Sequence, residues 1–195
     1  MAEETAQEHG QVREEQLDPE REARRRLALA QIRQYPDPVL RMRAKEVESF
    51  DDDLRRLVER MTGLMQDASG VGLAATQVGV LQRVFVLQAQ PEDEPRALVN
   101  PQIVDRSEET FTDDEGCLSL VGVTIPVERP LRVTLEAKDE TGADVRLELE
   151  EHAARVAQHE LDHLDGILII DRTTAEARRE ALGVLRPEPI LGAIS

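Results

Sequence analysis

Two histidines and a glutamate lie close together in the stretch QHELDHLDG, residues 158–166. His159 and His163 are four residues apart, so on a helix both side chains project from one face and can bind one metal ion. Glu160 lies about 100° around the helix axis from His159, where it can reach a water at the metal without ligating the ion. The spacing predicts two metal ligands and one acid/base group. The alternative is a helix whose histidines make only ordinary hydrogen bonds.

The surrounding residues favour a metal site over that alternative. Three of the four histidines of the chain fall within residues 152–163, and the same segment is apolar on much of its circumference. Buried polar groups must find hydrogen-bond partners, so a largely buried helix seldom carries two His and a Glu without a function. We therefore expect a metal-binding helix here.

A catalytic metal site needs a third protein ligand and an open position for water. No His follows His163, His9 lies in the charged N-terminal stretch, and His152 is seven residues before His159. The stretch EGCLS contains Cys117, the one cysteine of the chain. A lone cysteine is usually a small buried hydrophobe, but a thiolate is also a strong ligand for a borderline metal. Cys117 is the favoured third ligand.

Periodicity predicts the elements that must position these residues. Residues 51–69 have apolar side chains at helical spacing, with Ser49 or Asp51 as the N-cap. Alternating apolar residues predict a hairpin from the stretches LRVTLEA and DVRLELE. We also expect strands at 83–89 and, broken by a proline, at 97–104, a metal-binding helix at 150–164 and a last helix at 175–184.

The order of helix, strands and helix has no repeated βαβ pattern, which predicts an α+β fold. We expect small, mainly antiparallel sheets packed around a central helix that carries the metal motif. Residues 1–30 are a charged extension, expected to be mobile or loosely helical, with the folded domain starting near Ile32. The catalytic domain is expected over residues 31–172, and residues 173–195 form a C-terminal helix and tail.

Composition and charge exclude several functional classes. The chain has 195 residues, 40% of them hydrophobic and 33% charged, which suits one globular domain. The net charge of −16 argues against direct binding of duplex DNA, because phosphate binding requires a basic face. No apolar run approaches the roughly 20 residues that span a bilayer, and the polar N-terminus lacks a secretory signal. These features predict a cytoplasmic protein without membrane contact.

Three motifs together resemble the signature motifs of the peptide deformylase family. They are GVGLAATQ at residues 70–77, EGCLS at 115–119 and QHELDH at 158–163, in fitting order and spacing. The resemblance covers roughly residues 31–172. That family removes the formyl group from the N-terminal methionine of new bacterial and organellar proteins. The resemblance implies formylmethionyl peptides and nascent chains as substrates and one divalent metal, usually Fe2+, with Ni2+, Co2+ or Zn2+ able to replace it.

The resemblance also implies a role for individual residues. It makes Glu160 the general acid/base, and it makes Gln77 and the backbone N–H of Leu118 the donors to the developing oxyanion. Cys117, His159 and His163 hold the metal. Val71 and Gly72 are the candidates for contact with the substrate backbone, and Val156 for the wall of the methionine pocket. Glu115, Arg129 and Asp162 are expected to support the ligands through hydrogen bonds, although Asp162 can also be read as a surface acid.

The sequence departs from the family pattern near the substrate. Val121 occupies a place where relatives often have proline, and His152 one where an apolar residue or glycine is commoner. Both departures concern the shape of the pocket and not the metal. Arg155 is expected to point away from the pocket. In some relatives a C-terminal helix docks to the ribosome; here acidic neighbours offset Arg178 and Arg179, which weakens the case for a transient ribosome contact.

Three other functions compete with the deformylase. One is a related amidohydrolase with an altered substrate preference, motivated by His152 and Val121. A second is a zincin-type protease, which predicts a third ligand other than Cys117. A third is a binding module without activity, which predicts the loss of Glu160, Gln77 or a ligand, and none of these is lost.

Overall fold

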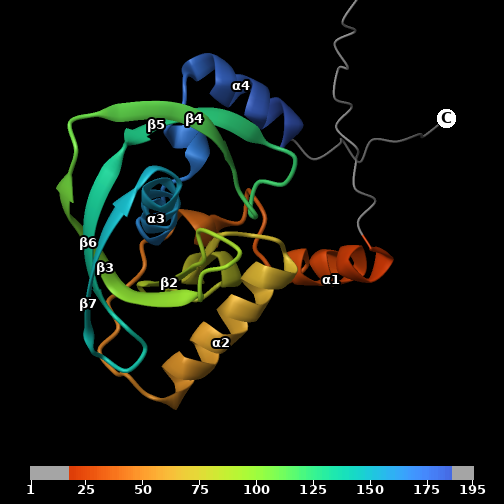
Figure 1. The fold of residues 1–195 in the computed structure, drawn as a ribbon. Helices are drawn as coiled ribbons and strands as arrows, with labels where there is room; N and C mark the ends of the chain where they lie inside the picture. The colour runs from red at the N-terminus through yellow and green to blue at the C-terminus, as the bar shows by residue number, and fades with distance from the viewer. Residues whose placement is uncertain (1–17, 186–195) are drawn as a thin grey trace, which may run out of the picture.

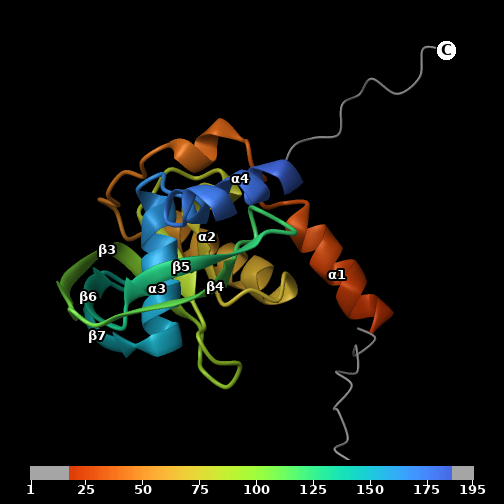
Figure 2. The same ribbon diagram turned by 90° about the horizontal axis from the view of Figure 1, so that it is seen from above.

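The computed structural model describes residues 18–185 of the chain. Within that range, two antiparallel sheets are packed with helices (Figure 1 and Figure 2). The helices are α1 (Pro19–Leu29), α2 (Asp52–Asp67), α3 (Glu151–Leu164) and α4 (Ala175–Val184), with short 3-10 helices η1 (Pro38–Arg41), η2 (Ala75–Val78) and η3 (Ile169–Asp171). The strands are β1 (Gly72–Ala74), β2 (Val84–Leu87), β3 (Arg96–Arg106), β4 (Thr110–Gly116), β5 (Thr124–Pro130), β6 (Arg132–Lys138) and β7 (Asp144–Glu150).

Both sheets are antiparallel. The larger has the strand order β1-β2-β3-β6-β7, and the smaller is the hairpin of β4 and β5. The predicted hairpin is β6 and β7, which pair from Arg132↔Glu150 to Lys138↔Asp144. Its turn is closed by Asp139, whose side chain accepts hydrogen bonds from the backbone N–H groups of Thr141 and Ala143. The prediction of an α+β fold with mainly antiparallel sheets is confirmed.

Helix α3 lies inside the curve of the strands. Figure 1 looks almost along its axis, and the strands bend around it. Its side chains Ala157 and Leu164 are fully buried, in a cluster with Phe85 of β2, Leu98 of β3 and Leu135 of β6. Close packing on this face fixes the rotation of α3 about its axis and so fixes where its histidines point.

Helix α2 has the amphipathic pattern predicted for it. Asp51 is the N-cap, and its side chain accepts hydrogen bonds from the backbone N–H groups of Asp53 and Leu54. Met61 and Met65 are completely buried in the core cluster beneath the helix. The two methionines are therefore core residues.

Strand β3 differs from its prediction. It runs without interruption for 11 residues, whereas a short strand with a break at Pro101 was expected. The pairing with β6 shifts register between Val99 and Gln102, which accommodates the missing N–H of proline. Asn100 has a positive φ of 51°, and its side chain bonds both backbone groups of Val47. The strand accommodates Pro101 with a β-bulge and does not end there.

The smaller sheet was not predicted at all. Strand β4 has the sequence TFTDDEG, in which only Glu115 is fully buried, so no alternation of apolar residues marks it. Strand β5 buries Ile125, Val127 and Arg129 and exposes the residues between them. Residues 117–123, called the Cys117 loop below, thus connect the two strands of a hairpin.

Helix α1 packs on the domain. Its N-cap Asp18 accepts a hydrogen bond from Glu20 N–H, and Pro19 occupies the first turn. Ala28 and Ile32 are buried in the same cluster as α2. Packing contacts therefore cross the boundary expected near residue 31, while residues 1–17 lie outside the described part. Across the described range, every helix is too short or too polar to cross a membrane.

Asp171 of η3 bonds residues of η1 and α4, and these contacts are expected to stabilise the fold. Burial alone raises the pKa of Asp171, but hydrogen bonds from Arg41 of η1 and from Leu168 N–H outweigh it and lower the pKa, with Arg178 of α4 3.2 Å away. Asp171→Asn is therefore expected to cost stability at neutral pH, by about 1 kcal/mol or less because solvent screens this partly exposed group. Urea denaturation of the chelator-treated proteins measures the loss.

The pH dependence has a defined sign. A lowered folded-state pKa stabilises above the unfolded value of about 3.9, and this contribution disappears as the pH falls through the folded value. The difference between Asp171→Asn and the parent is therefore expected to be constant while the pH stays well above the unfolded pKa, and to shrink as the pH falls below about 4. Asp144→Asn, at an exposed ion pair with Lys138, is the control. A difference that is absent at pH 7 contradicts the prediction.

Candidate metal centre

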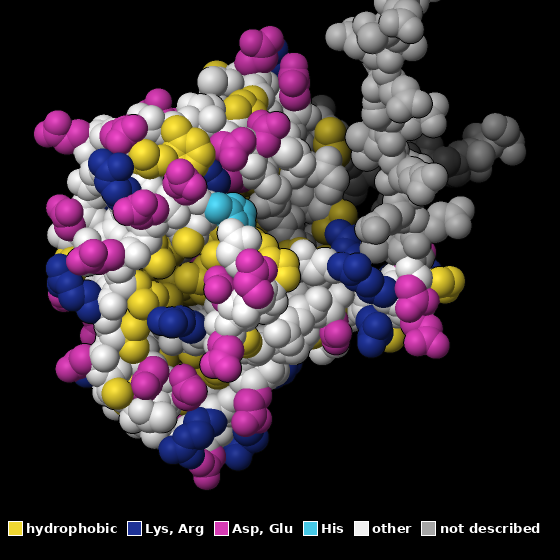
Figure 3. Space-filling model, in the orientation of Figure 1, with side chains coloured by type: hydrophobic (Ala, Val, Ile, Leu, Met, Phe, Trp, Pro, Cys, Tyr) yellow, Lys and Arg dark blue, Asp and Glu magenta, His cyan; other side chains and the backbone are white. Residues whose placement is uncertain are grey.

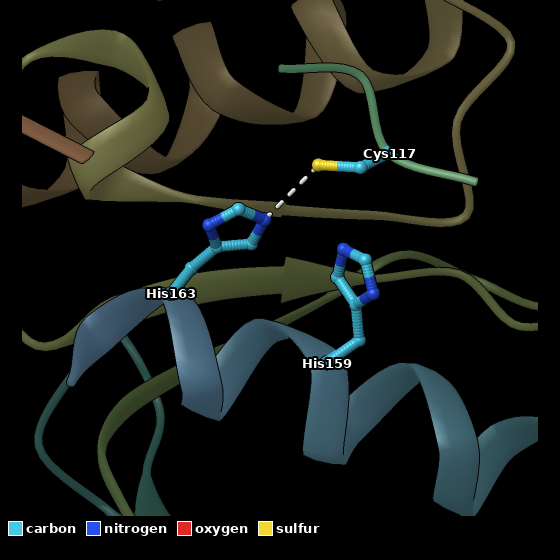
Figure 4. A group of neighbouring side chains, drawn as sticks. All are labelled: Cys117, His159 and His163. Atoms are coloured by element: carbon cyan, nitrogen blue, oxygen red, sulfur yellow. Dashed lines mark hydrogen bonds between the residues drawn. The ribbon is translucent and has the colours of Figure 1, made fainter. Parts of the chain in front are cut away.

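The three predicted ligands lie together between the Cys117 loop and α3. Figure 4 shows Cys117, which follows β4, facing His159 and His163 on α3. The Cys117 Sγ is 3.2 Å from His163 Nε2, and the ligand atoms of all three residues lie within 4.8 Å of one another. Metal–sulfur bonds of about 2.3 Å and metal–nitrogen bonds of about 2.1 Å fit these separations. A thiolate with two imidazoles suits a divalent transition metal.

Glu115 orients the first histidine. Its Oε2 lies 3.0 Å from His159 Nδ1, so a proton on Nδ1 leaves Nε2 free to face the metal. Burial lowers the pKa of His163 well below its usual value, which keeps this ligand neutral. His163 Nδ1 has no hydrogen-bond partner in residues 18–185.

Glu115 is itself held by arginines. Arg129 Nε and Nη2 bond its two carboxylate oxygens at 2.5 and 2.9 Å, and Arg155 Nη1 bonds Oε1 at 2.8 Å. Burial alone raises the pKa of Glu115, but the bonds from Arg129 and His159 outweigh it and hold the pKa far below its usual range. The carboxylate is therefore ionised whenever the protein is folded near neutral pH.

Asp162 extends this network to the C-terminal side of α3. Its Oδ2 accepts from Arg129 Nη1 at 2.9 Å, and both its oxygens accept from Arg172, at 2.6 and 3.1 Å. The Asp162 side chain is 12% exposed. Asp162 is thus part of a buried ionic chain and not a surface acid.

Glu160 is buried beside the candidate ligands and is tightly packed against Gly72. It is 3% exposed, and its Oε2 has no hydrogen-bond partner among the described residues. Burial raises the pKa of Glu160 to about 7. A carboxyl group with a pKa near neutrality can both accept and return a proton, as acid/base catalysis requires. The Cα of Gly72 faces it closely, and a Cβ there would lie 2.5 Å from Glu160 Oε1.

Gln77 of η2 points its amide nitrogen at the metal site. Its Oε1 accepts from Ala74 N–H at 2.8 Å, which fixes which end of the amide is the donor. Its Nε2 donates to Ser119 Oγ at 3.1 Å and lies 3.8 Å from Cys117 Sγ. One N–H of Gln77 is therefore directed towards the ligands.

A cavity of about 480 Å³ is lined by Cys117, His159 and Glu160. The three predicted substrate residues, Val71, Gly72 and Val156, all line it, and so does Leu118. His152 and Val121, the departures from the family pattern, lie in its wall as well, and both are exposed.

Two arginines of this network differ from what the sequence predicted. Arg155 was expected to point away from the pocket, but it is 4% exposed, lines the cavity and also bonds the carbonyls of Val127 and Phe111. Arg172 was not singled out. Arg172 lies 10 residues after Asp162, and no local sequence pattern indicates that their side chains pair. The Arg155 side chain is 5% exposed beside Glu115, whereas that of Arg172 is 45% exposed beside Asp162. Burying the charge of Arg155 is costly, and its carboxylate and carbonyl partners offset that cost.

Comparison with known proteins identifies relatives over most of the chain. The family described as "Polypeptide deformylase" matches residues 29–179. A peptide deformylase of Thermotoga sp. (strain RQ2) is 47% identical over 147 residues, which cover 75% of this chain and 88% of the relative. One of Clostridium botulinum (strain Alaska E43 / Type E3) is 48% identical over 148 residues, covering 76% and 99%.

Solved structures agree with the sequence relatives. The crystal structure of peptide deformylase from Thermotoga maritima has a TM-score of 0.71 at 47% identity and covers 73% of this chain and 96% of its own. Arabidopsis thaliana peptide deformylase 1B has a TM-score of 0.76 at 38% identity, covering 80% and 87%. Sequence, fold and site agree, and the chain belongs to the polypeptide deformylase family.

Proposed function

We propose that this chain hydrolyses the formyl amide at the N-terminal formylmethionine of newly made polypeptides and releases formate. The observation that carries the proposal is the placement of the Glu160 carboxylate beside a Cys117, His159 and His163 ligand set, within a chain of this family. Water adds its oxygen to the formyl carbon, the C–N bond breaks, and the products are formate and a free methionine amine.

Cys117, His159 and His163 would hold the metal. We take Fe2+ as the ion in the cell, with Ni2+, Co2+ or Zn2+ able to replace it in purified protein. When bound, the ion supplies Lewis acidity that activates water and polarises the formyl carbonyl. Glu115 supports this ligand set by holding His159 in the required tautomer.

Glu160 moves the proton. Its carboxylate accepts a proton from the attacking water and returns it to the leaving amine nitrogen, so that the amine departs neutral. Within residues 18–185 Glu160 Oε2 has no hydrogen-bond partner, which supports this role because no competing hydrogen bond occupies that oxygen.

Gln77 and the backbone N–H of Leu118 stabilise the charge that develops on the formyl oxygen. The fixed orientation of the Gln77 amide supports this, since a donor that is already aimed costs no reorganisation. Val156 forms the wall for the methionine side chain, and Val71 and Gly72 contact the substrate backbone.

We place the reaction in the cytoplasm, on nascent chains. Contact with the ribosome is transient in this proposal, because Arg178 of α4 is already paired with Asp171 and the chain is acidic overall. The same net charge of −16 disfavours direct binding of duplex DNA.

Formate release from a formyl-Met-Ala-Ser peptide tests the proposal. Protein prepared without oxygen and loaded separately with Fe2+, Ni2+ and Zn2+ is expected to turn over the peptide, with the metal content measured in each sample. Absence of turnover with every confirmed bound metal contradicts the proposal. Cys117→Ala is expected to lose the metal, and a variant that keeps it and cleaves internal peptide bonds favours a protease.

Gly72→Ala tests the close approach to Glu160. Its new Cβ would lie 2.5–2.9 Å from three Glu160 atoms, so the carboxylate must move. A displacement of this size in an acid/base group is expected to lower kcat by about 10²-fold. Gly63→Ala in α2 is the control, because nothing lies within 4 Å of its Cβ. Unchanged kcat in metal-loaded Gly72→Ala contradicts the prediction.

A further inference from the structure

Helix α1 lies almost wholly outside the segment shared with the family, yet it forms part of the catalytic cavity. The family match begins at residue 29, and α1 spans Pro19–Leu29. Arg25 and Leu29 line the same cavity as His159 and Glu160. Both ribbon views place the C-terminal end of α1 beside the connection of β4 and β5 (Figure 1 and Figure 2).

The position of Arg25 is held by contacts on both sides of it. Its Nε donates to the carbonyl of Ala68, at the end of α2, at 3.3 Å. Ala28, one turn later, is 2% exposed. Beyond the helix, Gln34 Nε2 donates to the carbonyl of Leu118 in the Cys117 loop at 2.9 Å. The end of α1 is therefore fastened to the walls of the cavity, and Arg25 is half-buried at its edge.

The charge of Arg25 has no carboxylate partner at ion-pair distance within residues 18–185. Its terminal nitrogens are also without a hydrogen bond in that range, since only Nε is bonded. Figure 3 shows Lys and Arg side chains gathered over α1 on a face otherwise rich in acidic side chains. Arg25 thus brings a positive charge to a cavity whose other charged lining includes Asp113 and Asp114.

We infer that Arg25 determines specificity for the polypeptide that follows formylmethionine and favours acidic side chains there. This inference rests on the proposed function. With the formyl group at the metal and the methionine against Val156, the next residues must leave the cavity across its edge, at roughly 3.3 Å per extended residue. The guanidinium fork matches a carboxylate in two hydrogen bonds, and Leu29 offers an apolar contact beside it.

The test uses three amidated peptides: formyl-Met-Glu-Glu, formyl-Met-Ser-Ser and formyl-Met-Lys-Lys. The parent, Arg25→Gln and Arg24→Gln are compared as metal-loaded full chains. Arg24 is exposed on the same helix and does not line the cavity. Each variant replaces one Arg by Gln, so the two have the same net charge. The ratio of kcat/KM for the Glu-Glu peptide over the Lys-Lys peptide is the quantity measured.

Arg25→Gln is expected to lower this ratio by roughly 10-fold through KM, with kcat little changed, and Arg24→Gln by less than about 2-fold. Added salt is expected to weaken the preference of the parent. An equal ratio in Arg25→Gln and the parent overturns the inference, and so does an equal fall in both variants. Failure of the parent to release formate from all three peptides overturns the proposed function instead.

Discussion

Glu160→Gln is expected to lower kcat for deformylation by about 10²- to 10⁴-fold while metal content and KM stay near the parent values. Glutamine keeps the size of the side chain but cannot accept a proton, so the attacking water and the leaving amine both lose their proton carrier. Glu160 is not among the clustered ligands, so the metal is expected to stay bound. Formate release under saturating peptide, normalised to bound metal, measures the effect.

Glu148→Gln is the matched control for this variant. Glu148 is exposed on β7, and its neutralisation changes the net charge by the same amount. Its kcat is expected to equal that of the parent. A fully metal-loaded Glu160→Gln protein with kcat within about 10-fold of the parent would assign the proton transfer to another group.

Arg129→Met is expected to have the largest effect on stability, a loss of about 3–5 kcal/mol in the free energy of unfolding. Arg129 is 4% exposed and joins the buried carboxylates of Glu115 and Asp162. Methionine fills much of the volume but leaves both carboxylates without their shared cation. Part of the loss comes from Glu115, whose pKa can no longer stay far below its usual range without that guanidinium.

Chemical denaturation of the apoprotein measures the loss without interference from bound metal. Arg132→Met is the control, because Arg132 pairs with Glu109 at an exposed site and such pairs contribute about 1 kcal/mol or less. A second expected result is weaker metal binding by about 10- to 100-fold, since Glu115 then holds His159 less firmly. A loss no larger than that of Arg132→Met would mean that Arg155 and Arg172 suffice to compensate the carboxylates.

The sequence alone determined the elements whose signals are local. Helix α3 was predicted over 150–164 and spans Glu151–Leu164, and the hairpin of β6 and β7 was predicted from its alternation. The two metal ligands predicted on α3 belong to this class, because four-residue spacing on a helix is enough to place two imidazoles on one face. Cys117 was predicted as the third ligand because the other candidates fitted less well, and the structure places it beside the two histidines.

Only the tertiary structure decided which distant charges meet. The pairing of Arg155 with Glu115 and of Arg172 with Asp162 depends on how α3 sits against β4 and η3, and nothing in the spacing of these residues reveals it. The hairpin of β4 and β5 escaped prediction because β4 carries polar residues, and its partner makes it a strand. The place of α1 at the cavity also follows from packing, through Ala28 and the Arg25 contact with Ala68.

The division between what the sequence determined and what the tertiary structure decided has a physical reason. Helix periodicity, strand alternation and caps arise from neighbours within a few residues, so the sequence determined the helix that carries His159 and His163, most of the larger sheet and the class of chemistry. Buried ion pairs and cavity walls arise from residues that lie dozens of positions apart, as in the 40 residues between Glu115 and Arg155. Their free energy exists only once the chain is packed and water is excluded, so the tertiary structure alone decided which residues support His159 and which line the cavity beside it.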